Sequence, residues 1–217
     1  MPEPSRPRES GTKPSGSPEQ SVGTDAIRIG QDGVARCWWP GDDPLYLAYH
    51  DEEWGVPVTD ERRMIEMLVL ESFQAGLSWL TILRRREGFR AALDGFDPQA
   101  IAEYGDADVA RLMSDSRIIR NRAKILATIG NAQATLRLNQ AGTSLVRLFQ
   151  AAAPSGGREP PRTIADIPTT TPEATTLSKD LRTKGFKFLG PTVLYAHMQA
   201  TGVVNDHVLG CAFRDRG

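Results

Sequence analysis

Four of the five cysteine and histidine residues form two pairs near opposite ends of the sequence. Cys37 is followed by His50 after twelve intervening residues, and the stretch "NDHVLGC" near the C-terminus contains His207 and Cys211. If this stretch is helical, His207 and Cys211 share a face, because residues i and i+4 of a helix lie above one another. Two thiolates and two imidazoles make a complete tetrahedral ligand set for zinc. Four protein ligands leave no open position, so such a metal would be a structural clasp joining the ends of the folded region.

Other interpretations of these residues stay open at this point. Two buried free cysteines and two ordinary histidines would need no metal, and the spacing of Cys37 and His50 matches no standard zinc finger. A Cys37–Cys211 disulfide is another alternative, although a reducing compartment argues against it. Asn205 and Asp206 are candidate hydrogen-bond partners for a ligating imidazole.

A second candidate group centres on one carboxylate. In "RMIEMLVLESFQAG", the residues Met64, Met67, Leu68 and Glu71 fall at i, i+3, i+4 and i+7, which is the spacing of one helix face. Glu71 is therefore expected among core-facing residues, where an acid is costly unless it is paired or hydrogen-bonded. A salt bridge to an arginine would account for it, and so would a role as acceptor in a ligand pocket.

Aromatic residues flank this carboxylate in the sequence. Trp79 follows Glu71 after a glycine break, and five more lie within seventeen residues around His50: Trp38, Trp39, Tyr46, Tyr49 and Trp54. An ordinary core could use such residues. A flat aromatic slot with one acidic acceptor also matches what a flipped nucleobase needs, because its faces stack and its amino and ring N–H groups need an acceptor.

A cationic segment joins two expected helices. The stretch "DADVARLMSDSRIIRNRAKILATIGNA" predicts a helix, a short turn that includes Arg117, and a longer helix. The expected DNA phosphate contacts in this region are Arg120, Arg122 and Lys124, aided by the amides at the second helix's start. A solvated charged surface is the alternative explanation. A second cationic cluster could extend this DNA-binding surface. It comprises Arg182, Lys184 and Lys187.

The elements that would position these residues are almost all helical. Capping residues, glycine stops and proline starts predict helices within 43–55, 59–76, 78–96, 97–105, 106–116, 121–142 and 191–202. Strand signals are weak, so the expected fold is all-α, an irregular multi-helix domain around one core. The Pro-, Gly- and Thr-rich segment 153–171 is expected to be a long loop.

Length, net charge and composition limit the class of protein to which the chain can belong. The chain has 217 residues and a formal net charge of −1, which neither requires nor excludes a nucleic-acid partner. Residues 1–34 lack aromatic residues and are rich in Pro, Ser, Gly, Glu and Arg, which predicts a disordered tail before one domain at 35–217. Neither a secretory signal nor a membrane-spanning run is present, so we expect a protein of a bacterial-type cytoplasm without membrane attachment.

The chain resembles the 3-methyladenine DNA glycosylase I family of the helix-hairpin-helix glycosylases over nearly all of residues 36–211. The resemblance is carried by "RCWWPGDDPLYLAYHDEEWGVP", "LESFQAGLSWLTIL", "IIRNRAKI", "IGNA" and "LSKDLRTKGFKFLGPTVLYAHMQATGVVNDHVLGC". Its most specific parts are "YHDEEWGVP", "QAGLSW" and "VNDHV". One departure is Arg117, which stands where the family often has a glycine in the hairpin turn.

The resemblance implies a role for individual residues. The family's zinc ligands fall on Cys37, His50, His207 and Cys211, and its acidic pocket residue falls on Glu71. Its pocket aromatics correspond to Trp39, Tyr46, Tyr49 and Trp79, with Trp54 close by. Leu77 corresponds to the leucine that fills the gap left in the base stack. One structural zinc per chain is implied.

The resemblance also implies an activity. It indicates a monofunctional repair enzyme that flips 3-methyladenine out of damaged double-stranded DNA and hydrolyses its N-glycosidic bond, leaving an abasic site. The methylated base is cationic while attached, so little acid catalysis is needed, and Glu71 would accept hydrogen bonds at the adenine edge. A monomer is expected. The rival hypothesis is a zinc-clasped DNA-binding protein without activity, against which a buried acid in an aromatic pocket argues.

Overall fold

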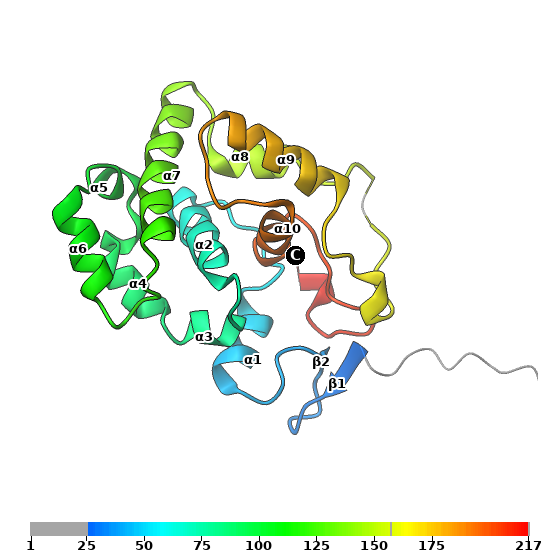
Figure 1. The fold of residues 1–217 in the computed structure, drawn as a ribbon. Coiled ribbons are helices and arrows are strands. Elements are labelled where there is room, and N and C mark those ends of the chain that lie inside the picture. Colours follow the sequence, from blue (N-terminus) through cyan, green and yellow to red (C-terminus); the bar gives the residue numbers. More distant parts are fainter. Residues whose placement is uncertain (1–25, 157, 217) are drawn as a thin grey trace, which may run out of the picture.

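The computed structural model describes residues 26–156 and 158–216, and most of these residues are helical, as the sequence predicts (Figure 1). The one sheet among them is a short antiparallel hairpin of β1 (Ile27–Ile29) and β2 (Ala35–Cys37). The α-helices are α1 (Pro44–Glu52), α2 (Glu61–Gln74), α3 (Trp79–Leu83), α4 (Arg86–Ala92), α5 (Pro98–Ala102), α6 (Asp106–Ser114), α7 (Arg122–Gln140), α8 (Leu145–Ala151), α9 (Pro172–Thr183) and α10 (Pro191–Ala200). Short 3-10 turns are η2 (Asp94–Phe96), η3 (Ile164–Asp166) and η4 (Arg214–Arg216).

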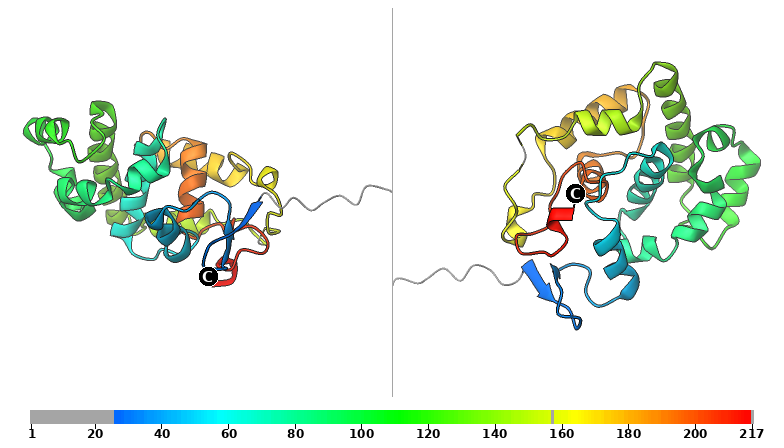
Figure 2. Two further views of the ribbon diagram at one scale, coloured as in Figure 1. Left: turned by 90° about the horizontal axis from the view of Figure 1, so that it is seen from below. Right: turned by 180° about the vertical axis from the view of Figure 1, so that it is seen from behind.

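Helix α2 forms the centre of the domain. It packs against α10, α8 and α7, and ten consecutive residues from Met64 to Phe73 are buried. Helices α4, α5, α6 and α7 lie on one side of it, and α8, α9 and α10 lie on the other (Figures 1 and 2). Because both sides of α2 are covered, a buried polar residue on this helix must be paired inside the core or face a cavity.

The β1–β2 hairpin shows that the N-terminal tail ends earlier than predicted. Residues 26–34 fall within the segment expected to be disordered, yet Ile27 pairs with Cys37 in the hairpin register. Ala26 is buried against Cys37 and Val208, and Asp32 accepts hydrogen bonds from Arg36. Val208 belongs to a distant part of the chain, so the composition of the tail alone did not indicate this packing. Residues 1–25 of the predicted tail lie outside the described residues.

Several predicted helices are shorter or interrupted. The segment 78–96 divides into α3, α4 and η2, and Gly95 adopts a positive φ of 63° within the last of these. Helix α2 is capped by the Asp60 side chain, which accepts from the Arg63 N–H, and the preceding threonine is not the cap. Helices α8 and α9 were not predicted, and segment 153–171 contains the short turn η3.

No helix among the described residues has the length and apolar composition required to cross a membrane.

Candidate functional site

Cys37, His50, His207 and Cys211 meet in one buried cluster, in which one ligand atom from each lies within 4.8 Å of the others. The Cys211 Sγ is 3.3 Å from His207 Nδ1 and 3.7 Å from His50 Nε2. The Cys37 Sγ is 3.6 Å from His207 Nδ1. A tetrahedral zinc ion with bonds of ~2.3 Å to sulfur and ~2.0 Å to nitrogen separates such atoms by roughly 3.5 Å. The four residues could therefore hold a metal ion, and both cysteines are free thiols.

The stretch from His207 to Cys211 is not helical, although the two residues do converge. The stretch after α10 is irregular, and the Cys211 N–H donates to the Val208 carbonyl at 3.0 Å. Gly210 adopts a φ of 91°, a conformation that glycine accepts without a steric penalty. A tight turn, rather than one face of a helix, brings the two side chains together.

The second nitrogen of each imidazole has its own acceptor. His50 Nδ1 lies 2.8 Å from Asp51 Oδ1, and the Asp51 carboxylate is held by Arg36. His207 Nε2 lies 3.1 Å from the Trp54 carbonyl oxygen. These bonds leave His50 Nε2 and His207 Nδ1 directed at the sulfurs, which is the arrangement that metal-ligating histidines require.

The predicted partners of the imidazoles serve other groups. Asn205 Oδ1 accepts the backbone N–H of His207 at 3.2 Å. The Asp206 carboxylate is fully buried and binds Arg158, Tyr195 and Gln199.

The pKa values of the two thiols are shifted in opposite directions. The pKa of Cys211 is lowered, chiefly by a hydrogen bond from Cys37 and further by His207 and His50. The pKa of Cys37 is raised, first by that hydrogen bond and then by burial. A cation at the centre would allow both sulfurs to be thiolates, because a coordinating thiol loses its proton outright.

A cavity of about 260 Å³ lies beside this cluster and is lined by Trp38, Trp39, Tyr46, Tyr49, Trp54, Glu71, Gln74, Trp79, Ile167, Ala196 and Gln199. Local sequence positions several of these side chains. The Asp43 side chain caps α1, so that Tyr46 and Tyr49 follow at i and i+3 on the helix. Ser78 caps α3 and places Trp79 at its first position. All five pocket residues proposed from the sequence thus line one cavity.

Glu71 is buried at the pocket with no hydrogen bond or ion pair to its carboxylate from any described residue; 5% of the residue is exposed. Burial raises its pKa to about 8. The salt bridge to an arginine that was considered for Glu71 is formed instead by Glu66. This residue is also buried on α2 and pairs with Arg86 and Arg90. Burial first, and then the charge of Glu71, raises the pKa of Tyr46 to about 12.

Aromatic rings connect the Cys/His cluster to the pocket. The Trp39 ring centroid is 5.0 Å from His50, 5.0 Å from Tyr46 and 5.1 Å from Trp54. Trp54 in turn lies 4.6 Å from the His207 ring. A metal that fixes the two histidines would therefore also fix one wall of the pocket.

Sequence reasoning missed several lining residues. Gln74 follows Glu71 by three residues on α2, and this helical spacing could have indicated it. Ile167 follows η3, whereas Ala196 and Gln199 lie on α10. No local pattern marks these three residues, because only the tertiary packing brings their segments to α1 and α2.

The predicted phosphate contacts separate into two groups. Arg120 and Arg122 are exposed in the turn between α6 and α7 and at the start of α7. Lys124 is buried, and its ammonium donates to the Phe73 carbonyl at 3.2 Å, so its predicted place on the surface is wrong. Arg117 pairs with Asp115. Leu77, which follows Gly76 after α2, is 40% exposed.

The described residues thus form a mostly helical domain in which a buried Cys/His cluster lies beside an aromatic pocket that contains an acid. Residues 39–215 match the family model described as methyladenine glycosylase. The chain belongs to this family.

Individual relatives cover most of the chain. DNA-3-methyladenine glycosylase 1 of Escherichia coli (strain K12) is 49% identical over 181 residues, which span 82% of this chain and 96% of that protein. A crystal structure of 3-methyladenine DNA glycosylase I is 47% identical, has a TM-score of 0.79 and covers 82% of this chain and 98% of its own. A variant of 3-methyladenine DNA glycosylase I in complex with 3-methyladenine is 36% identical, has a TM-score of 0.76 and covers 79% and 93%.

Proposed function

We propose that this chain is a DNA-3-methyladenine glycosylase that extrudes the damaged base from double-stranded DNA, hydrolyses its N-glycosidic bond and leaves an abasic site. The observation that carries the proposal is Glu71, a buried carboxylate in an aromatic cavity that has no hydrogen-bond or ion-pair partner among the described residues. Membership of the methyladenine glycosylase family and the names of the relatives support the same activity. We further propose that it acts as a monomer in the bacterial cytoplasm.

The chemistry follows from the charge of the lesion. Adenine methylated at N3 is cationic while it is bonded to deoxyribose, and cleavage of the C1′–N9 bond releases it as a neutral base. Water adds its oxygen to C1′ and loses a proton. The protein must therefore extrude, recognise and enclose the base, with little need for acid catalysis.

The pocket residues suit these tasks. Trp39, Tyr49 and Trp79 would wall or stack on the base, and Glu71 would accept hydrogen bonds from its amino edge. The pKa of Glu71 is about 8 because of burial, and a cationic base nearby would stabilise the carboxylate form. Recognition is thus strongest for a base that brings both donors and a positive charge.

We propose that one structural zinc ion is held by Cys37, His50, His207 and Cys211. The donor types, the spacing of the ligand atoms and the acceptors behind both imidazoles support this choice. Zinc bound there would hold the two thiolates and fix the ends of the domain. Four protein ligands leave no position for a substrate, so no chemical step is assigned to the metal.

For DNA contact, we propose that α6, the turn 115–121 and α7 form the helix-hairpin-helix element. Arg120 and Arg122 would bind phosphate, and Leu77 would fill the gap left by the extruded base. Lys124 is not among these contacts, because its ammonium is buried against α2.

The test is release of free 3-methyladenine from alkylated duplex DNA, compared between the unmodified chain and Glu71→Gln. The substitution keeps the shape of the side chain but sets an amide donor against the donors of the base, which costs on the order of 1–3 kcal/mol. We expect release to slow by roughly tenfold to a hundredfold, together with weaker binding of the free base.

Glu103→Gln is the matched control, because Glu103 is an exposed acid distant in sequence from the pocket. It should leave release and zinc content unchanged. If the unmodified chain binds DNA but releases no base, the rival hypothesis of a DNA-binding protein without activity would replace the proposal. Equal release and equal base affinity for Glu71→Gln would remove Glu71 from the recognition site.

A further inference from the structure

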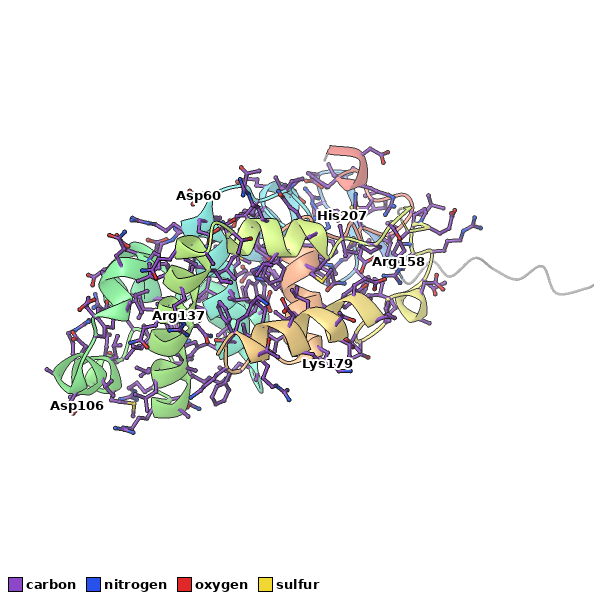
Figure 3. All side chains as sticks on the ribbon, turned by 90° about the horizontal axis from the view of Figure 1, so that it is seen from above. Asp60, Asp106, Arg137, Arg158, Lys179 and His207 are labelled. Carbon is purple, nitrogen blue, oxygen red and sulfur yellow. The ribbon has the colours of Figure 1, made fainter. Side chains whose placement is uncertain are left out.

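One arginine of the segment 153–171 connects this segment to the body of the domain. Arg158 Nη1 lies 2.9 Å from Asp206 Oδ1 and also contacts the Tyr195 hydroxyl. Its Nη2 donates to the Asp166 carbonyl oxygen at 2.5 Å. Figure 3 labels Arg158 and His207 at the same end of the molecule. One guanidinium thus joins the segment's own backbone to a buried carboxylate of the C-terminal region.

The Asp206 carboxylate is fully buried and also binds a residue that lines the pocket. Its Oδ2 accepts the Tyr195 hydroxyl and, at 2.8 Å, the Gln199 amide. Gln199 lines the cavity that contains Glu71. The acceptor that holds Arg158 is therefore the same group that holds a pocket side chain on α10.

At its other end the guanidinium holds the peptide group that precedes Ile167. The Asp166 carbonyl belongs to the bond between Asp166 and Ile167, and Ile167 lines the cavity. The Asp166 side chain also accepts the backbone N–H groups of Arg162 and Thr163 at 2.8 and 2.7 Å, which closes the turn η3. The direction in which Ile167 leaves this turn thus depends on contacts that converge on Asp166.

We propose that Arg158 is a positioning residue for the pocket, which acts by holding Ile167 as one wall around the bound base. The inference rests on the proposed function, since it concerns the same cavity. Ile167 lines the pocket but belongs to the long segment 153–171. Ordering such a segment when the base binds would cost conformational entropy, unless the segment is already held in place. Arginine suits the task, because its planar fork serves two acceptors at once, whereas a lysine ammonium is a single point.

The experiment measures the affinity for free 3-methyladenine and the KM and kcat of base release for Arg158→Ala. We expect base affinity to fall roughly tenfold, which corresponds to ~1.4 kcal/mol, and KM to rise while kcat changes little. Ile167→Ala should produce a similar loss. In the double variant the loss should be no larger than in Ile167→Ala alone, because Arg158 acts through Ile167.

Two further variants separate positioning from charge and from folding. Arg162→Ala removes the same charge from an exposed position of the same segment and should leave affinity and KM unchanged. Arg158→Lys keeps the ion pair with Asp206 but serves one acceptor only, so it should recover part of the affinity. If Arg158→Ala does not fold, Arg158→Lys and Ile167→Ala provide the comparison.

Unchanged affinity in Arg158→Ala, or in Arg158→Lys if only that variant folds, would overturn the inference, as would fully additive losses in the double variant. The proposed function fails differently: in that case the unmodified chain neither binds nor releases 3-methyladenine.

Discussion

Two glutamates of α2 show how burial alone does not define a functional acid. Glu66 and Glu71 are both buried, but Glu66 Oε1 lies 2.6 Å from Arg86 Nε, and Arg90 adds a second ion pair. The Glu71 carboxylate has no such partner among residues 26–156 and 158–216, and burial raises its pKa to about 8. Helical spacing predicted that Glu71 faces inward, but it could not predict which of the two acids the arginines of α4 would reach.

The unpaired acid should reduce the stability of the domain in a pH-dependent way. The pKa of Glu71 is about 8 in the folded chain against an ordinary value of 4.5, so the folded state binds more protons between these values. The free energy of unfolding therefore falls as pH rises from about 4.5 to 8. Glu71→Gln removes this loss and should raise the unfolding free energy above pH 8 by up to a few kcal/mol, on the order of 1.4 per pKa unit.

Denaturant unfolding of both proteins at pH 5, 7 and 9 checks this expectation. The difference between them should be small at pH 5 and largest at pH 9. A difference that is the same at all three pH values would show that Glu71 has no raised pKa. The same substitution should slow base release, so this position would exchange stability for function.

At the scale of elements, Lys124 shows why a basic cluster cannot be assigned to DNA from sequence alone. Asn121 caps α7, and Lys124 lies in its first turn with the ammonium against the Phe73 carbonyl in the last turn of α2. A cation there is favoured by the negative end of the α2 dipole and satisfies a terminal carbonyl. Lys124 therefore joins two helices, while Arg120 and Arg122 remain at the surface.

Replacing the two surface arginines and replacing the buried Lys124 should therefore have different effects. Arg120→Ala combined with Arg122→Ala should weaken binding to damaged and undamaged duplexes alike, because phosphate contacts carry no base specificity. The slope of log affinity against log salt should fall by roughly 0.9 for each contact removed. Lys124→Met should instead lower the unfolding free energy by about 1–3 kcal/mol with an unchanged salt slope. A selective loss of affinity for damaged DNA alone in the arginine variant would contradict the phosphate assignment.

Helix positions were predictable where caps and periodicity agreed. The segments over α1, α2, α7 and α10 were anticipated to within a few residues, because Asp43 and Asn121 cap two of them and Pro191 starts a third. The hairpin β1–β2 was not, since its three-residue strands are stabilised by Val208 and other distant residues. The convergence of His207 and Cys211 was expected for a helical stretch, but a turn brings them together, because a turn and a helix can both place residues four apart side by side.

At the scale of the whole molecule, the Cys/His cluster joins the two ends of the described domain. In Figure 1 the hairpin and the segment after α10 lie side by side, and their residues supply Cys37, His207 and Cys211. The meeting of these residues was predictable from residue type, since the chain has only two cysteines. The pocket contributions of Ile167 and Gln199 were not, because they depend on how the 153–171 segment and α10 pack around the cluster.

This arrangement predicts one tightly bound zinc ion per chain, with a larger effect on stability than on chemistry. Metal analysis of the purified protein should give a ratio near one zinc per chain. Cys211→Ser removes one ligand of a closed site and should lower Tm by roughly 5–15 °C, as expected for a loss of a few kcal/mol in a domain of this size. Base release by the folded fraction should persist, because no substrate position exists on the metal.

Ala212→Ser, at an exposed neighbouring position, is the matched control and should change neither zinc content nor Tm. Purified protein that contains no zinc, or a Cys211→Ser variant with unchanged Tm, would show that the four residues are packed in the core without a metal.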